Sequence, residues 1–203
     1  MRLAGLILLW FVLLFGVFTS PYVAKSPTVG DDLTRRTVWL ALLFYAGAAS
    51  SMFRLGAQDW RGKTPLGRIA RWSWTLAWAA FVIHVGVAFH FYHHWSHAAA
   101  VEHVRERSGV GEGVFASYLF TVAWTADVAW WWVRPASYAR RPTWVGRALH
   151  GFMVAMIFFA TVVYEEGPVR WLGLALCGGL LLGFATHPSH DPRSTHNSTS
   201  LPL

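Results

Sequence analysis

The chain contains a single cysteine, Cys177, among its 203 residues. One cysteine cannot form a disulfide within the chain, and it cannot supply the paired thiolates of a cysteine-based metal or redox motif. These two classes of structure are therefore excluded. Because Cys177 lies in an apolar run, we interpret it as a small packing residue.

Charge is also scarce. Only 13% of the residues are charged and 55% are hydrophobic, whereas soluble domains carry about 25% charged residues. The shortage comes from six long apolar runs, each able to cross a hydrocarbon core of about 30 Å as a helix. The predicted spans are Leu3–Thr19, Thr37–Phe53, Trp72–Trp95, Val114–Val133, Ala148–Tyr164 and Val169–Thr186. Because irregular backbone is nearly excluded from lipid, the sequence predicts an all-α, polytopic bundle of six transmembrane helices in contact with the lipid bilayer.

The first run has a cleaved signal peptide as its alternative, because it directly follows Met1 and Arg2. We favour a retained helix, since no small-x-small cleavage site follows and the run is long for the apolar part of a signal peptide. Residues 1–187 are predicted to form one transmembrane domain. Residues 188–203 are rich in Ser, Thr and Pro and are predicted to form a disordered, polar cytoplasmic tail.

Acidic residues are fewer than basic residues, at 10 against 17. The basic residues gather in the second and fourth connections between spans. These are Arg54, Arg61, Lys63, Arg68, Arg71, Arg134, Arg140, Arg141 and Arg147. Because Lys and Arg concentrate in short cytoplasmic loops, both termini are predicted to be cytoplasmic, in a cell or inner membrane. The excess of positive charge is explained by cytoplasmic loops that contact anionic lipid headgroups, so we expect no nucleic-acid partner.

Tryptophan is abundant, with 13 residues. Many of them lie near the ends of the predicted spans. Trp72, Trp74, Trp95, Trp130, Trp131, Trp132 and Trp171 are of this kind. Indole rings favour the headgroup level, so we predict an interfacial aromatic belt.

Small residues occur together in the second and sixth spans, at positions 47–51 and at Gly179 and Gly183. Small residues spaced by four allow helices to approach closely. We favour packing inside the bundle, and the alternative is a homo-oligomer or membrane-protein partner that binds through these faces.

Histidine is concentrated at the end of the third span, at His90, His93, His94 and His97. The offsets of 0, 3, 4 and 7 place all four on one face if the helix continues through them. The charge pattern of the loops places this face at the extracytoplasmic surface. Two i, i+4 histidine pairs can direct several imidazoles at one ion, which predicts a transition-metal site.

The cluster has no carboxylate on its own face, so an acidic ligand has to come from another helix. Glu165 and Glu166 follow the fifth span on the same predicted side of the membrane. The predicted ligands are thus His90, His93, His94, His97, Glu165 and Glu166, a set that suits zinc, iron or copper. Two further interpretations remain open: amphipathic histidines that anchor at the headgroups, and a pH-sensing cluster.

The segment His90-Phe91-Tyr92-His93-His94 has the form H-x-x-H-H. It resembles one histidine box of the membrane di-iron desaturases and hydroxylases. That resemblance implies a di-metal, oxygenase-like enzyme, but it covers five residues, and those enzymes use several boxes around one centre. The remaining histidines of this chain lie elsewhere, so the pattern favours binding over catalysis.

Three polar residues are predicted to lie within the bundle, namely Asp127, His84 and His150. An ionisable group at membrane depth is a candidate functional site, and His150, Arg134 and His84 are the expected partners of Asp127. The alternatives are a structural polar contact and a proton relay from Asp127 through His84 to the outer cluster. A bis-histidine haem is not expected, because it needs two histidines at matching depth and His84 has no such partner.

The sequence therefore predicts a multi-pass membrane protein that binds a transition metal at the outer end of its third helix, for metal handling or redox chemistry. One alternative is a di-metal membrane enzyme. The other is a non-catalytic structural or accessory subunit of a membrane complex.

Overall fold

The computed structural model describes residues 3–163 and 168–186, and the elements within these residues are all helical. The α-helices are α1 (Leu3–Val23), α2 (Val29–Met52), α3 (Pro65–Phe91), α4 (His97–Ser108), α5 (Gly113–Val133), α6 (Pro135–Tyr138), α7 (Thr143–Phe158) and α8 (Pro168–Thr186). A 3-10 turn, η1 (Asp59–Arg61), precedes α3, and a π-helical segment, η2 (Phe159–Val163), continues α7. The predicted tail, residues 188–203, lies outside the described residues.

The helix boundaries follow local chemistry. Thr64 caps the start of α3 by accepting a hydrogen bond from the Gly67 backbone N–H at 3.0 Å, and Pro65 occupies the first helical position, where its missing N–H costs nothing. Ser96 caps α4 in the same way. Gly109 ends α4 in the left-handed conformation, with φ of 77°, which glycine adopts without steric cost.

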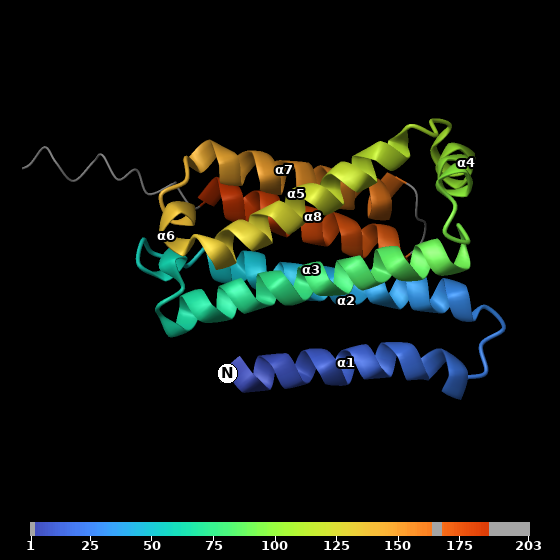
Figure 1. Ribbon diagram of the computed structural model, residues 1–203, viewed down its shortest axis with the longest axis horizontal. Helices are drawn as coiled ribbons and strands as arrows, with labels where there is room; N and C mark the ends of the chain where they lie inside the picture. The colour runs from blue at the N-terminus through green and yellow to red at the C-terminus, as the bar shows by residue number, and fades with distance from the viewer. Residues whose placement is uncertain (1–2, 164–167, 187–203) are drawn as a thin grey trace, which may run out of the picture.

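The long helices run side by side, and α2 and α3 form an extended pair (Figure 1). Helix α4 lies at one end of the bundle, and α6 and η1 lie at the other. The second and fourth connections, which carry the basic residues, therefore share one end, as the span parity predicts. Helix α1 joins the bundle through Trp10, whose indole N–H donates to the Leu76 carbonyl at 3.0 Å.

Three helical segments within the described residues are long and apolar enough to cross a membrane: Leu3–Val23, Pro65–Phe91 and Thr143–Val163. A shorter apolar helix covers Arg170–Gly183. These helices are compatible with a membrane protein in contact with lipid. Helices α2 and α5 coincide with the other two predicted spans but are not among these candidates. Helix α2 carries Asp31 and Asp32 in its first turn, and α5 contains the buried Asp127.

Aromatic side chains fill the centre of the bundle. Tyr45, Trp74 and Trp124 come from three different helices, and their ring centroids lie 5.1 to 6.0 Å apart. Trp74 and Trp131 are only 1% and 0% exposed. The prediction of an interfacial role is wrong for these two, because neighbouring elements bury both rings. The Trp74 N–H donates to the Asp127 carboxylate, and the Trp131 N–H donates to the Trp60 carbonyl. Trp95 and Trp171, in contrast, are exposed.

Gly183, one of the small residues that the sequence singles out in α8, packs inside the molecule. A Cβ at Gly183 would overlap the Phe53 ring at the end of α2. This contact supports the predicted internal role of that glycine. Gly47 and Gly179 have open space around them, because no atom lies within 4 Å of the position that a Cβ would take. The lone cysteine, Cys177, is buried in α8, as expected for a packing residue.

Candidate functional sites

The predicted histidine face does not form, because α3 ends at Phe91. His94 and Trp95 have φ values of 46° and 60°, in the left-handed region. For residues other than glycine this conformation costs about 1–2 kcal/mol each. The turn is held by the Trp95 N–H, which donates to the Phe89 carbonyl at 3.0 Å, and by the Ser96 N–H, which donates to the His93 carbonyl at 2.7 Å. The expectation of one continuous helix from His90 to His97 is therefore wrong.

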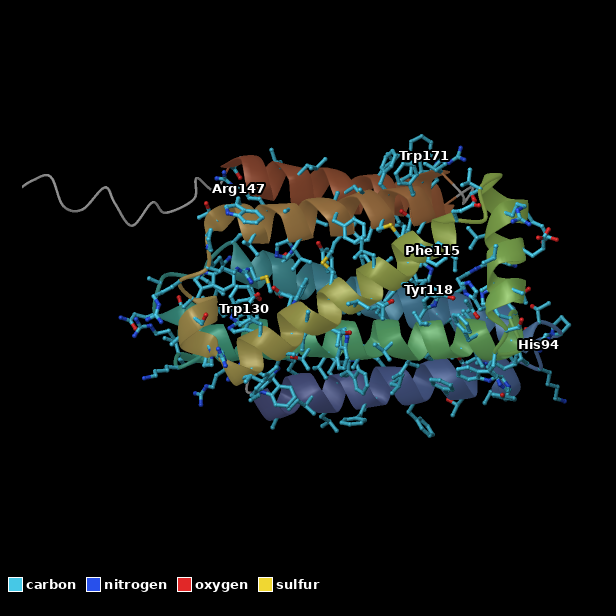
Figure 2. All side chains as sticks on the ribbon, turned by 45° about the horizontal axis from the view of Figure 1, so that its top comes forward. His94, Phe115, Tyr118, Trp130, Arg147 and Trp171 are labelled. Carbon is cyan, nitrogen blue, oxygen red and sulfur yellow. The ribbon has the colours of Figure 1, made fainter. Side chains whose placement is uncertain are left out.

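The four imidazoles consequently have different surroundings. His90 and His94 are exposed, and His94 lies at the tip of the bundle, far from Trp130 (Figure 2). His97 begins α4, and its Nδ1 lies 2.9 Å from the hydroxyl of Tyr118 on α5. Among these four histidines His93 alone is buried, with 8% of its surface exposed.

His93 contacts a histidine that does not belong to the predicted ligand set. On a continuous helix His103 would face away from the cluster, but the left-handed turn redirects α4. The rings of His93 and His103 now meet edge to face, with centroids 5.3 Å apart. Burial, and the nearby imidazoles of His103 and His94, lower the pKa of His93. The ring is therefore neutral at pH 7, which is the form that binds metals.

One nitrogen of this ring is unsatisfied. His93 Nδ1 is buried and has no hydrogen-bond partner among the described residues. Buried polar atoms without partners are rare, and an ion or a water that completes the site is one of the usual reasons.

The wider predicted ligand set does not converge within the described part of the chain. No group of three or more His, Cys, Asp or Glu side chains there is placed to hold one metal ion. Glu165 and Glu166, the predicted carboxylate ligands, lie outside the described residues. Of the predicted set, the structure thus brings only His93 into a buried contact with another histidine.

A second site surrounds Asp127 at the opposite end of the bundle. Its carboxylate accepts hydrogen bonds from the Trp74 indole N–H and the Tyr138 hydroxyl, each at 2.9 Å, and pairs with the Arg141 guanidinium at 3.0 Å. The Asp127 and Arg141 side chains are only 6% and 10% exposed. These partners differ from the Arg134 and His84 that the sequence suggests, because the chain turns back at Pro135 and carries Arg141 into the core.

Aromatic rings enclose this ion pair. The Arg141 guanidinium carbon lies 3.7 Å from the Tyr138 ring centroid, and Tyr138 stacks on Trp131 at 4.8 Å. The Trp131 indole N–H donates to the Trp60 carbonyl at 2.9 Å, which attaches η1 to the same cluster. Burial and the adjacent Asp127 carboxylate raise the pKa of Tyr138, so its hydroxyl remains a donor. These contacts hold the η1 turn and the segment from Tyr138 to Arg141 against α5.

The sequence does not suggest Trp74, Tyr138 and Arg141, which contact Asp127, or the adjacent Trp60 as partners in this site. The available signal was a short connection with Pro135 and Pro142, which limits how far Arg141 can lie from the end of α5. That signal restricts the distance, but it does not distinguish Arg141 from the exposed Arg140 beside it.

The remaining intramembrane candidates have separate partners. His84 Nδ1 lies 3.0 Å from the Thr34 carbonyl oxygen and 3.4 Å from the Thr37 hydroxyl, both on α2. His150 is buried against Trp74, with ring centroids 5.3 Å apart, and its Nδ1 lies 3.5 Å from the Tyr45 hydroxyl. Trp74 therefore contacts both the His150 ring and the Asp127 carboxylate, whereas His84 lies in another part of the bundle.

Comparisons of the chain with models of known protein families, with curated proteins and with solved structures give no match.

Proposed function

We propose that this chain is a six-span integral membrane protein that binds a transition-metal ion at the turn between α3 and α4, for metal handling or redox chemistry. The observation that carries this proposal is the buried Nδ1 of His93, which lacks a hydrogen-bond partner among the described residues while its ring contacts His103. Imidazole nitrogens are common ligands of zinc, copper and iron, and two imidazoles in contact offer two of them.

The ligand set of the proposal follows from the turn. His93 and His103 form its centre, and the neighbouring histidines His90, His94 and His97 and the acids Glu165 and Glu166 are the candidates for further ligands. The two left-handed residues support a functional role, because strained backbone conformations cluster at binding sites. Zinc, iron or copper remain the proposed ions.

Metal content tests this proposal directly. We expect purified protein to take up zinc, copper or iron(II) in stoichiometric amount, and we expect His103→Ala to weaken uptake at least tenfold. His103 is only half-buried, so this variant should fold. Val110→Ala, at an exposed position just after α4 whose side chain carries no ligand atom, is the matched control. Elemental analysis after dialysis against each ion gives the measurement, and wild-type protein that remains free of all three ions would overturn the proposal.

The proposed orientation places both termini and the two basic connections in the cytoplasm. The charge pattern and the common location of these connections at one end of the bundle support it. The chain has one cysteine, so Cys177→Ser gives a background for labelling. In intact cells, an impermeant maleimide should label His94→Cys, and it should label Arg140→Cys only after the membrane is opened. The reverse pattern would show that the orientation is inverted.

A further inference from the structure

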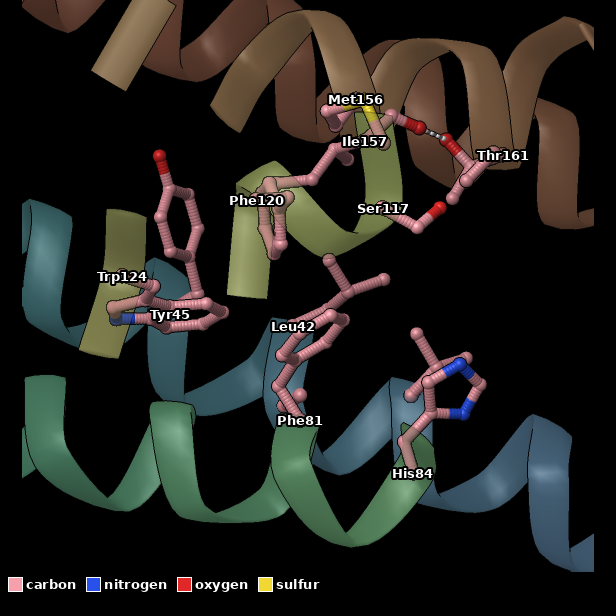
Figure 3. Close-up of a pocket in the computed structure, with 13 residues that line it drawn as sticks. Leu42, Tyr45, Phe81, His84, Ser117, Phe120, Trp124, Met156, Ile157 and Thr161 are labelled. Carbon is pink, nitrogen blue, oxygen red and sulfur yellow. Dashed lines mark hydrogen bonds between the residues drawn. The ribbon is translucent and has the colours of Figure 1, made fainter. Parts of the chain in front are cut away.

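A cavity of about 180 Å³ lies between α2, α3, α5 and the α7–η2 segment (Figure 3). It is separate from both sites described above. Its walls are mainly apolar. His84, Ser117 and Thr161 lie toward one end, and the Tyr45 hydroxyl and the Trp124 indole nitrogen lie toward the other (Figure 3). The lining residues are Val38, Ala41, Leu42, Tyr45, Phe81, His84, Ser117, Phe120, Trp124, Met156, Ile157, Ala160 and Thr161.

The aromatic wall favours a flat ring. Phe81 stacks on Trp124 with an interplanar angle of 28°, and Phe120 meets Phe81 edge to face at 4.8 Å. Apolar cavities of about 150 Å³ in protein cores stay dry and accept benzene. The volume here is slightly larger, so it fits one aromatic ring with a small substituent.

The end at His84 offers hydrogen-bond acceptors. The Thr34 carbonyl can only accept, so His84 Nδ1, at 3.0 Å from it, carries the proton in the neutral ring. Nε2 of His84 is then an unprotonated acceptor, and no hydrogen bond to it is present among the described residues. The Thr161 hydroxyl donates to the Ile157 carbonyl at 2.7 Å, which leaves its oxygen as an acceptor too. A ligand hydroxyl at this end can therefore donate to Nε2 of His84.

The cavity opens on the side of the bundle. Ser117 and Ala160 line it and are exposed, whereas Phe120, Trp124 and Ile157 are buried. Ala160 and Thr161 belong to η2, and π-helical turns are frequent at functional sites. An opening between α5 and η2 faces lipid in the proposed six-span arrangement, so it admits lipid-soluble molecules.

We propose that this cavity binds a lipid-soluble phenol, with its ring against Phe81 and Trp124 and its hydroxyl donating to Nε2 of His84. The volume, the aromatic walls and the acceptor Nε2 of His84 favour this class. The proposal does not depend on metal binding at the outer turn.

Binding of 4-fluorophenol and of fluorobenzene to protein in nanodiscs, followed by fluorine NMR against empty nanodiscs, tests the proposal. The two probes differ by one hydroxyl group. We expect wild-type protein to bind 4-fluorophenol about tenfold more tightly, as a single buried hydrogen bond allows. His84→Leu should remove this preference and retain fluorobenzene binding.

A second variant makes the test independent of His84. Ala160→Leu fills the opening and should abolish binding of both probes, whereas Ala155→Leu, an exposed position on α7 outside the cavity, should leave both unchanged. Equal affinities of the two probes for wild-type protein would overturn the assignment of a phenol. Binding that survives Ala160→Leu would overturn the assignment to this cavity.

Discussion

Replacing Arg141 with methionine is expected to lower the free energy of unfolding by about 3–5 kcal/mol. The substitution leaves the Asp127 carboxylate buried with two neutral donors, Trp74 and Tyr138, and without its cation. An uncompensated buried charge is more costly than the loss of the attraction itself. Unfolding in detergent, followed by tryptophan fluorescence, provides the measurement.

Two further variants separate this effect from a change in loop charge. Arg140→Met removes the neighbouring, exposed cation, and it should change stability by no more than about 0.5 kcal/mol. Combining Arg141→Met with Asp127→Asn removes both charges, and it should recover most of the lost stability. If Arg141→Met proved as mild as Arg140→Met, the buried ion pair would not stabilise the fold.

Gly67→Ala is expected to destabilise the protein by about 1–3 kcal/mol, the usual cost of overpacking. A Cβ at this position would overlap the Asp59 carbonyl oxygen and lie 2.8 Å from its carbon. These are backbone atoms, so the collision cannot be relieved by rotating a side chain. The η1 turn has to move, and with it Trp60, which accepts the Trp131 hydrogen bond.

Gly86→Ala in the same helix is the matched control. No atom lies within 4 Å of a Cβ at Gly86, and glycine in a helix interior costs about 0.8–1.0 kcal/mol relative to alanine. This variant should therefore be more stable than the wild type. Both variants are measured by the same unfolding experiment, and equal effects of the two substitutions would exclude close packing of α3 against η1.

Sequence reasoning located the helical segments well, because hydrophobic runs and proline or glycine at their ends are local signals. The end of α4 is an example, since it falls at Gly109, a residue type that favours helix ends. The same reasoning failed at His94 and Trp95, because neither residue type signals a left-handed turn. The turn depends on how α4 and α5 return against α3, and no local pattern contains that information.

The sequence by itself determined that this chain is helical, apolar and suited to a membrane, because these properties are averages over long runs of residues. It also identified Asp127, His84 and the outer histidines as polar groups that need partners. Only the tertiary structure decided which residues are those partners. Arg141 rather than Arg134 pairs with Asp127, and His103 rather than His97 meets His93. Such choices depend on how short turns direct helices in space, and a turn of a few residues can reverse the face that a side chain presents.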